Sequence, residues 1–332
     1  MQESNALMTD PVEGDMLAVK PYFVKRVLFL NGLTRSGKFF LGNLLASLTH
    51  LEHYQYAAIL EHLAYMVHLG EITEETAAAL IRLHIDDHAY DMAIGRNLNM
   101  RSTDLSSLQR SPDLALYLRR SEAADIPVLL NDFESNKRRP CFILHDCFNR
   151  VSLFCSAGFE DMKMIHLDRH PIDLAYSWYQ RGWGTRFGTD PMSFVPVVTG
   201  DKTPLPWFAA SWKERYENLS PMDRVIESIS YLRRTGEEAF QKLSIDEQKQ
   251  IFWTTYESLV ECPEPTLRAV ADFLNVSVKE DALSMVLKQE RVPGKSPAES
   301  RNKKLSEIRE KSSPESFRTL LEVASQYEAG HQ

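Results

Sequence analysis

The stretch VLFLNGLTRSGKFFL, residues 27–41, combines a short apolar run, a loop of small residues and the start of a helical pattern. Residues 27–30 have the length and composition of a buried parallel strand. Asn31 and Gly32 end this run, and apolar residues return from Phe40 onward with helical spacing. A strand, a small-residue loop and a helix direct free backbone N–H groups toward an anion. We therefore expect a phosphorylated or sulfated ligand at this loop.

The loop departs at one position from the Walker A pattern of nucleotide hydrolases. Gly32, Gly37 and Lys38 match, but Phe39 stands where a Ser or Thr hydroxyl would bind Mg²⁺. Arg35 and Lys38 add positive charge. A loop that cradles phosphate without this hydroxyl suits transfer of a group with less charge than a phosphoryl. The alternative is a glycine-containing turn that binds no ligand.

Composition places the chain among globular proteins. It has 332 residues, of which 43% are hydrophobic and 25% are charged, with a net charge of −8. This charge argues against general nucleic-acid binding, although it allows a local basic pocket. No apolar run approaches the length of a membrane span, and the acidic, polar N-terminus does not resemble a signal peptide. The four cysteines follow no zinc spacing, so we expect reduced thiols and a cytoplasmic protein.

Short strands alternate with helical stretches along the chain. Further strands are predicted at residues 141–144, 162–167 and 251–253, the last one reaching Tyr256. Thr73 is a candidate N-cap, and Pro171 suits the first turn of a helix. The pattern predicts an α/β fold with a central parallel sheet flanked by helices and a helical insertion after the first βα unit.

The expected domain organisation is a flexible arm (1–20) followed by a single α/β domain (21–332). Within the domain, a helical region at about 48–120 and a long loop at 182–206 are expected to shape a substrate pocket. A basic tail follows at about 288–304. Six histidines between residues 50 and 88 form no HExxH pattern, so no metal site is expected.

Three segments, taken together, resemble the sulfotransferases that use 3′-phosphoadenosine 5′-phosphosulfate (PAPS). The first, TRSGKFF at 34–40, resembles the 5′-phosphosulfate loop of that family. The second, HLDRHPIDLAYSWY at 166–179, is similar to its 3′-phosphate segment. The third, TYESL at 255–259 with its following helix, resembles its Tyr-Glu-Asp-Leu segment. The three occur in the family's order over most of the chain, and the resemblance implies a P-loop-like sulfotransferase fold.

The resemblance implies a role for each matching residue. The loop that holds the 5′-phosphosulfate comprises Thr34, Arg35, Ser36, Gly37, Lys38 and Phe39. Arg169 and Ser177 would bind the 3′-phosphate, and Tyr256 would line the adenine pocket. Arg291 and Lys295 loosely resemble the segment that closes over the 3′-phosphate. Lys38 and Phe39 replace the family's usual pair of threonines.

The residues themselves leave alternatives to these roles. A guanidinium at a strand end and a hydroxyl two turns into the next helix suit a phosphate that is not transferred. Arg169 could instead form an ion pair with Asp168 or Asp173. Ser177 could be a helical residue with no role in binding, and Tyr256 could be a core residue.

Catalysis would need cations at the leaving phosphate and a base at the acceptor. Arg35 and Lys38 supply the cations. We expect His145 to be the base, because it ends a strand and its reference pKa is near neutral. Glu61 and Glu52 are competing candidates, and a purely structural His145 is a further alternative.

The expected function is metal-free transfer of a sulfuryl group from PAPS to an acceptor hydroxyl or amine by in-line displacement, leaving 3′-phosphoadenosine 5′-phosphate (PAP). A Mg²⁺-dependent P-loop kinase or nucleotide hydrolase and a non-catalytic nucleotide-binding module are the alternatives. The expected acceptor is a small molecule or a glycan, with no nucleic-acid or membrane partner. The sequence does not indicate which acceptor is used or how many subunits assemble.

Overall fold

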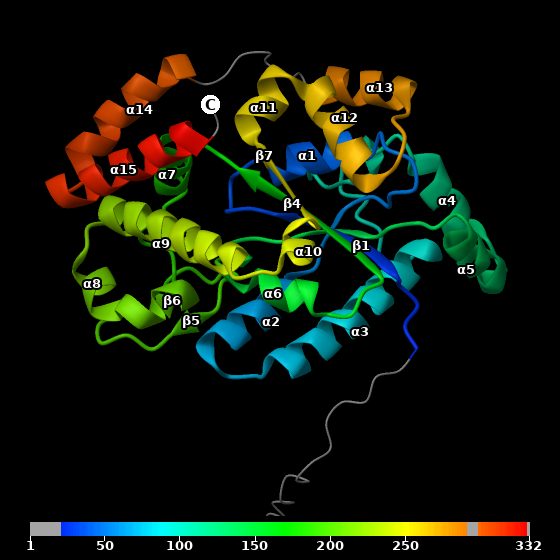
Figure 1. The fold of residues 1–332 in the computed structure, drawn as a ribbon, viewed down its shortest axis with the longest axis horizontal. Helices are drawn as coiled ribbons and strands as arrows, with labels where there is room; N and C mark the ends of the chain where they lie inside the picture. Colours follow the sequence, from blue (N-terminus) through cyan, green and yellow to red (C-terminus); the bar gives the residue numbers. More distant parts are fainter. Residues whose placement is uncertain (1–20, 291–297, 331–332) are drawn as a thin grey trace, which may run out of the picture.

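The computed structural model describes residues 21–290 and 298–330, and its centre is a five-stranded parallel sheet (Figure 1). The strand order is β2-β3-β1-β4-β7. The strands are β1 (Arg26–Asn31), β2 (Gln55–Tyr56), β3 (Cys141–Ile143), β4 (Asp161–Asp168) and β7 (Ile251–Thr255). The predicted α/β class and parallel sheet are confirmed. The expected flexible arm lies outside the described residues, as do Arg291 and Lys295.

The four strands expected from apolar runs are all present, whereas β2 was not expected. This strand lies at the edge of the sheet within the region predicted to be helical. Helix formation resumes only at Ala58, so residues 46–57 cross the edge of the sheet in irregular and extended conformation. A strand of two residues pairs through its backbone. It is too short to show the alternation of apolar and polar residues by which a strand is predicted from sequence.

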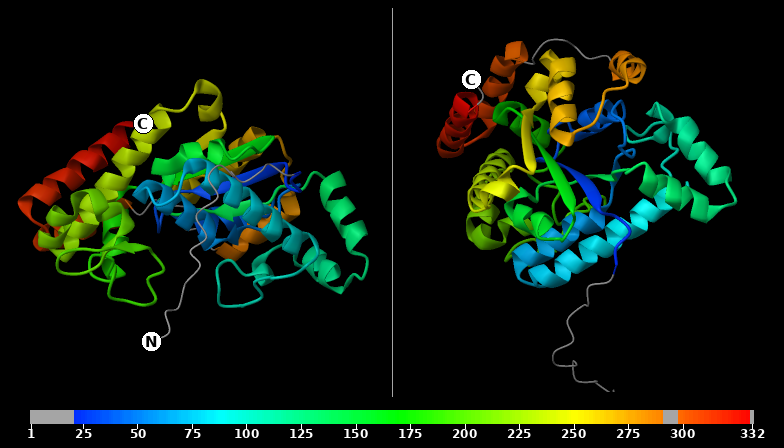
Figure 2. Two further views of the ribbon diagram at one scale, coloured as in Figure 1. Left: turned by 90° about the horizontal axis from the view of Figure 1, so that it is seen from below. Right: turned by 45° about the vertical axis from the view of Figure 1, so that its right-hand side comes forward.

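Helices cover both faces of the sheet (Figures 1 and 2). The first half of the chain contains α1 (Lys38–Leu45), α2 (Ala58–Leu69), α3 (Glu74–Ala93), α4 (Leu114–Glu122), α5 (Ile126–Ser135), α6 (Val151–Cys155) and α7 (Pro171–Gln180). The second half contains α8 (Lys213–Asn218), α9 (Pro221–Gln241), α10 (Ile245–Gln248), α11 (Tyr256–Glu261), α12 (Pro263–Leu274), α13 (Glu280–Glu290), α14 (Ala298–Lys311) and α15 (Pro314–Gly330).

Two helix starts that were predicted from sequence are confirmed. The Thr73 hydroxyl caps α3 by accepting a hydrogen bond from the Thr76 N–H. Pro171 occupies the first turn of α7, where its missing N–H costs nothing.

Alternate residues of the central strands point into two different hydrophobic clusters. Val27 and Phe29 of β1 face a cluster built with α2, α3, α6, α7 and α9. Leu28 and Leu30 face the other cluster, built with α1, α12 and α13. Both faces of the sheet are therefore buried, which explains the nearly continuous apolar run in β1.

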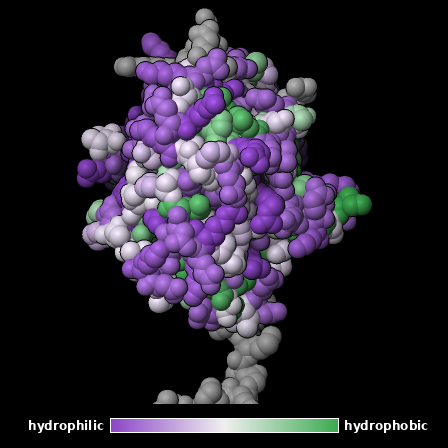
Figure 3. All heavy atoms as spheres, turned by 90° about the vertical axis from the view of Figure 1, so that its left-hand side faces the viewer, coloured by the Kyte–Doolittle hydropathy of each residue, from purple (hydrophilic) through white to green (hydrophobic). Residues whose placement is uncertain are grey.

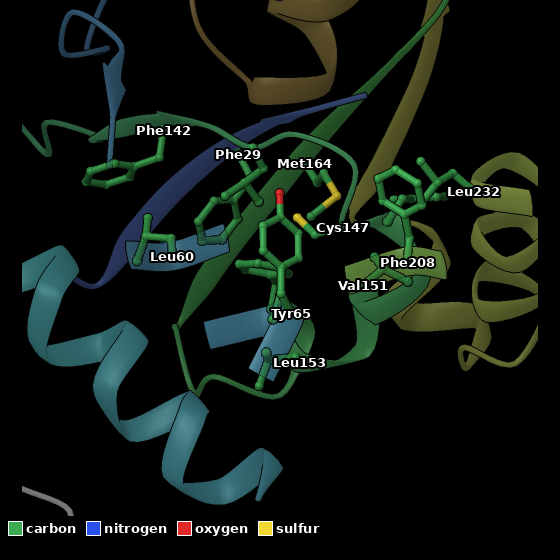
Figure 4. Close-up of a cluster of buried hydrophobic side chains, with 14 of the residues drawn as sticks. Phe29, Leu60, Tyr65, Phe142, Cys147, Val151, Leu153, Met164, Phe208 and Leu232 are labelled. Atoms are coloured by element: carbon green, nitrogen blue, oxygen red, sulfur yellow. The ribbon is translucent and has the colours of Figure 1, made fainter. Parts of the chain in front are cut away.

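Figure 4 shows part of the first cluster, which packs against the sheet. Tyr65 rises from α2 into this cluster among Phe29, Met164 and Cys147, with its hydroxyl directed toward the sheet. Buried aromatic packing of this kind gives α2 a fixed position against the sheet.

The segment 182–206 is mostly irregular, as predicted. It contains two antiparallel pieces, β5 (Val197–Val198) and β6 (Leu205–Pro206), and leads into the 3-10 helix Trp207–Trp212. The face drawn in Figure 3 is largely hydrophilic, with small, separate hydrophobic areas.

Candidate active site

Four strands deliver the predicted site residues to one edge of the sheet. Their carboxyl ends lead into the loop after β1, His145 after β3, Arg169 after β4 and Tyr256 after β7. β1 lies between β3 and β4, and the strands that follow β1 in the chain lie first on its β3 side and then on its β4 side. This edge therefore contains the topological switch point of the sheet. Ligands of open parallel sheets bind at such a point.

Two glycines give the loop after β1 its shape. A Cβ at Gly32 would lie 2.3 Å from the Leu167 carbonyl oxygen of the neighbouring strand. Gly37 has φ of 106°, and a Cβ there would lie 2.4 Å from the Tyr256 ring. Arg35 adopts φ of 71°, also in the left-handed region. The turn ends at α1, whose first amides have no partner within the helix and point out of its N-terminus.

Lys38 is buried beneath this loop rather than extended from it. Its Nζ donates to the carbonyls of Gly32 at 2.6 Å and Leu33 at 2.8 Å, and only 2% of the residue is exposed. Burial lowers the pKa of the Lys38 amine to about 8, an effect that Asp146 and Glu61 partly oppose. Lys38 therefore stabilises the loop through these hydrogen bonds, and its positive charge lies beneath the loop.

Two further contacts fix Thr34. Asp146 accepts hydrogen bonds from the Thr34 N–H, at 2.7 Å, and from its hydroxyl. The Trp178 indole N–H donates to the Thr34 carbonyl at 2.7 Å. Thr34 is thus tied to the end of β3 and to α7, and Trp178, which is 1% exposed, is a core residue as well as an anchor.

Arg169 contacts the loop directly. Its Nη1 donates to the Arg35 carbonyl at 2.7 Å, and its guanidinium lies 4.5 Å from the centre of the Tyr256 ring. Its buried Nε has no hydrogen-bond partner among the described residues. The two carboxylates that could have paired with Arg169 are engaged elsewhere. Asp168 pairs with Arg233, and Asp173 pairs with Arg301 and Lys304.

Ser177 and Tyr256 contact these two arginines, Arg35 and Arg169 respectively. The Ser177 hydroxyl accepts from Arg35 Nε at 3.3 Å, which joins α7 to the loop. Tyr256 packs its ring against Gly37 and beneath the Arg169 guanidinium. The segments predicted to bind the two ends of a nucleotide therefore form one continuous surface.

Arg35, Arg169 and Tyr256, though not Ser177, line a cavity of about 390 Å³, which we call the arginine cavity. Its lining residues are Thr34, Arg35, Gly37, Lys38, Phe39, Phe40, Leu105, His145, Arg169, Arg181, Trp183, Arg186 and Tyr256. Partial burial lowers the pKa of the Arg35 guanidinium, and repulsion from Arg181 and Arg169 lowers it further. Such a concentration of positive charge in a chain of net charge −8 indicates an anionic ligand.

A histidine and a carboxylate form a pair beside this cavity. Glu61 Oε1 accepts from the His145 ring Nδ1 at 2.6 Å and from the His145 backbone N–H at 2.7 Å. The other oxygen, Oε2, accepts from the Tyr56 hydroxyl at 3.2 Å. The Tyr65 hydroxyl donates a hydrogen bond to the His145 carbonyl oxygen at 2.7 Å. Because the carboxylate accepts from Nδ1, that nitrogen carries the proton and Nε2 has the available lone pair.

His145 also lines a second cavity of about 220 Å³, which we call the aromatic cavity. The cavity has a polar end at Glu61, His145 and Asp146, and its other walls are mostly apolar. The walls come from Tyr56, Tyr65, Trp183, Phe187, Met192, Phe194 and Val195. Five of these seven residues belong to the loop 182–206, which was predicted to shape a substrate pocket. His145, Thr34, Trp183 and Arg186 line both cavities.

Comparison with known proteins identifies the family. The model of the sulfotransferase domain matches residues 25–322. The chain belongs to the sulfotransferase family. It is therefore an enzyme of the sulfotransferase class, as the resemblance of its three segments implied. No curated protein matches the chain.

Solved structures similar to this sulfotransferase include two sulfotransferase domains. The sulfotransferase domain of the curacin biosynthetic pathway shares 16% identity, over 79% of this chain and 78% of that one, with a TM-score of 0.44. The corresponding domain of the Synechococcus PCC 7002 olefin synthase shares 15%, over 94% and 98%, with a TM-score of 0.46. A retinol dehydratase in complex with androsterone and the inactive cofactor PAP shares 12%, over 80% and 64%, with a TM-score of 0.27. The family assignment rests on the domain match.

Glu52 has a structural environment in this sulfotransferase. Its buried carboxylate pairs with Arg120 and Arg138 and accepts from the Tyr117 hydroxyl. It lines neither the arginine cavity nor the aromatic cavity. Of the two glutamates that competed with His145, only Glu61 therefore reaches the site.

Two basic residues of the site were not expected from the sequence. Arg181 follows α7 and Arg186 lies five residues later, and both line the arginine cavity. The only sequence feature that pointed to them was their position, since Arg186 lies in the loop 182–206 and Arg181 directly precedes it.

Within residues 21–290 and 298–330, no group of three or more His, Cys, Asp or Glu side chains is placed to hold a metal ion.

Proposed function

We propose that this sulfotransferase uses PAPS as its donor and transfers the sulfuryl group to an acceptor hydroxyl or amine by in-line displacement, without a metal ion. The observation that carries the proposal is the position of His145, which lines both the arginine cavity and the aromatic cavity. A group at the junction of an anion-binding cavity and an apolar one can contact both reactants.

The arginine cavity provides the contacts that a doubly anionic nucleotide requires. The amides at the start of α1, with Arg35 and Lys38, would bind the 5′-phosphosulfate. Arg169 and Ser177 would bind the 3′-phosphate, and the unpartnered Nε of Arg169 is consistent with this role. Tyr256 would contact the adenine. Phe39 lies with its ring centre 6.4 Å from the His145 ring and offers no oxygen for Mg²⁺, which argues against a kinase.

His145 would act as general base in the transfer. Nε2 accepts the proton of the acceptor hydroxyl while the acceptor oxygen forms a bond to sulfur. The bond between sulfur and the bridging oxygen breaks, and the charge that develops on the leaving phosphate is stabilised by the loop amides, Arg35 and Lys38. Glu61 keeps the ring in the required tautomer and stabilises its protonated form.

The experiment that tests this function is binding of PAP by calorimetry. The nucleotide should bind with a dissociation constant in the micromolar range or below, and more tightly than adenosine 5′-phosphate, which lacks the 3′-phosphate. Arg169→Ala should weaken PAP binding by about 1.5–3 kcal/mol, because one charge-assisted contact is lost. Arg119→Ala, at an exposed position on α4, is the matched control. Equal affinities for the two nucleotides would refute the proposal.

The cellular setting is part of the same proposal. The four cysteines are free thiols, and no helix in the described part of the chain is long and apolar enough to cross a membrane. We infer a cytoplasmic enzyme whose acceptor is a small molecule or a glycan.

A further inference from the structure

A third cavity, of about 460 Å³, lies against the irregular and extended segment that includes β2. We call it the polar cavity. Its wall is built mainly from neutral polar side chains, among them His53, Gln55, Asn97, Asn99 and Ser106. The roles derived above for the arginine and aromatic cavities make no use of it.

Two side chains that line the polar cavity have unused hydrogen-bond acceptors. His53 is 6% exposed, and its Nε2 lies 3.0 Å from the Ser106 carbonyl oxygen. A carbonyl only accepts, so Nε2 carries the proton and Nδ1 has a lone pair. Nδ1 of His53 and Oε1 of Gln55 are both buried without a hydrogen-bond partner among the described residues. Residues two apart in extended chain project to the same side, so the two acceptors belong to one wall.

Buried acceptors without a partner are uncommon because each one loses its hydration without compensation. A ligand that brings O–H or N–H donors would compensate both. Burial also lowers the pKa of the His53 ring, so His53 is neutral and acts as an acceptor near pH 7.

The charge of the polar cavity distinguishes it from the arginine cavity. None of the described lining residues is a lysine or arginine, and Asp104 contributes a carboxylate. That carboxylate is paired with Arg101 at 3.2 Å. Anionic ligands are therefore disfavoured, and no unpaired carboxylate attracts a cation. The lining suits a neutral group rich in hydrogen-bond donors, and the ring of Tyr56 provides a face against which a sugar ring can pack.

The polar cavity adjoins the reactive site. Tyr56 lines both the polar and the aromatic cavity and is 47% exposed. Leu105 lines the arginine cavity, and its neighbours Asp104 and Ser106 line the polar cavity. A molecule whose reactive hydroxyl lies near His145 can thus extend past Tyr56.

We propose that the polar cavity is a second acceptor subsite, which binds a neutral, hydroxyl-rich, sugar-like group of the acceptor through His53 and Gln55. The proposal deepens the proposed function and rests on it for the identity of the reactive site. Binding at the subsite itself requires only the polar cavity.

The test compares acceptors that differ only in the sugar. The probes are the 4-hydroxyphenyl β-glycosides of glucose, galactose and mannose, with 4-methoxyphenol as the matched compound without a sugar. Affinities are measured by calorimetry on the full chain in the presence of PAP. At least one glycoside should bind about three- to tenfold more tightly than 4-methoxyphenol, the ratio expected for one or two neutral hydrogen bonds.

Two substitutions at one position separate hydrogen bonding from shape. Gln55→Met keeps the length of the side chain but removes one of the two acceptors, so the preference for the glycoside over 4-methoxyphenol should become smaller, with only the His53 acceptor left. Gln55→Glu keeps an acceptor oxygen and should retain the preference. Gln241→Met, at an exposed position on α9, is the control for the substitution itself. The unfolding temperature of each variant establishes that it is folded.

Two results would overturn the inference. One is that no glycoside binds the unmodified protein more tightly than 4-methoxyphenol. The other is that the size of the preference is unchanged in Gln55→Met. The measurement is independent of turnover, so a glycoside preference without PAP binding or sulfuryl transfer would contradict the proposed function and leave the polar subsite in place.

Discussion

At the scale of single residues, the central feature is the pairing of His145 with Glu61. One carboxylate oxygen accepts both the ring Nδ1–H and the backbone N–H of His145. The carboxylate therefore sets the tautomer and the orientation of the ring together. Two of the three candidate bases from the sequence, His145 and Glu61, therefore form one hydrogen-bonded pair, in which Nε2 of His145 has the unused lone pair.

Removing the proposed base should affect turnover most. We expect His145→Ala to lower kcat by about 10²- to 10⁴-fold, the usual contribution of a general base. Glu61→Gln should lower kcat less, because the amide oxygen still accepts from the ring but the stabilising charge is gone. Steady-state kinetics with PAPS and an acceptor would measure both. A larger loss in Glu61→Gln than in His145→Ala would instead identify Glu61 as the base.

We expect Lys38 to make the proposed nucleotide binding depend on pH. Its amine has a pKa of about 8 because burial disfavours the charge. A bound anion favours the protonated amine and raises this pKa, so binding takes up a proton above pH 8. Affinity for PAP should therefore begin to decrease as the pH approaches 8, where about half of the free amines are neutral, and decrease further as the pH rises.

The measurement is calorimetric titration of PAP from pH 7 to 9.5, above the second ionisation of the phosphates at about 6. Lys38→Met has no amine to titrate and should bind PAP more weakly, without the decrease above pH 8. A decrease of equal size in Lys38→Met would rule out Lys38 as its source.

At the scale of elements, the loop between β1 and α1 is held by contacts from three other strand ends. Gly32 lies against the end of β4, Asp146 after β3 holds Thr34, and Tyr256 after β7 packs on Gly37. The conformation of the loop is thus a property of the sheet edge as a whole.

A methyl group at Gly37 should disturb this arrangement. Gly37→Ala places a Cβ in the left-handed region and 2.4 Å from the Tyr256 ring. The strain costs about 1–2 kcal/mol, and overpacking adds about 1–3 kcal/mol if the ring stays in place. If the ring moves, affinity for PAP should fall instead.

Gly70 provides the matched control. It also has positive φ, of 75°, but no atom lies within 4 Å of a Cβ built there. Gly70→Ala should therefore show the strain alone, as a lowered midpoint of urea unfolding with unchanged PAP affinity. Identical stability and PAP affinity in the two variants would mean that the contact between Gly37 and Tyr256 is unimportant.

At the scale of the whole molecule, one sheet separates two hydrophobic clusters. The cluster built with α2, α3 and α9 contains or contacts all five tryptophans. The cluster built with α1, α12 and α13 contains Cys141. Because the same strands supply side chains to both, we propose that residues 21–332 form a single domain.

A single domain should unfold in one transition. Tryptophan fluorescence reports the first cluster, and reactivity of the Cys141 thiol reports the second when Cys147, Cys155 and Cys262 are replaced by serine. Both signals should change at the same urea concentration, together with far-UV circular dichroism. Separate midpoints would indicate two independently folding units.

The sequence by itself determined the parallel sheet, four of its five strands, the position of the glycine-containing loop after β1, and the family. These features depend on short-range patterns: an apolar run of a strand's length, glycines at fixed offsets, and a proline at the start of a helix. The strand β2 was not predictable because it pairs through its backbone over two residues.

Only the tertiary structure decided which charged groups are available to a ligand. Arg169 is directed to the loop because Asp168 pairs with Arg233 and Asp173 with Arg301, residues far away in the chain. Glu52 forms ion pairs with Arg120 and Arg138, whereas Glu61 contacts His145. The strength of each electrostatic interaction depends on distance and burial in space, and neither quantity is contained in the local sequence.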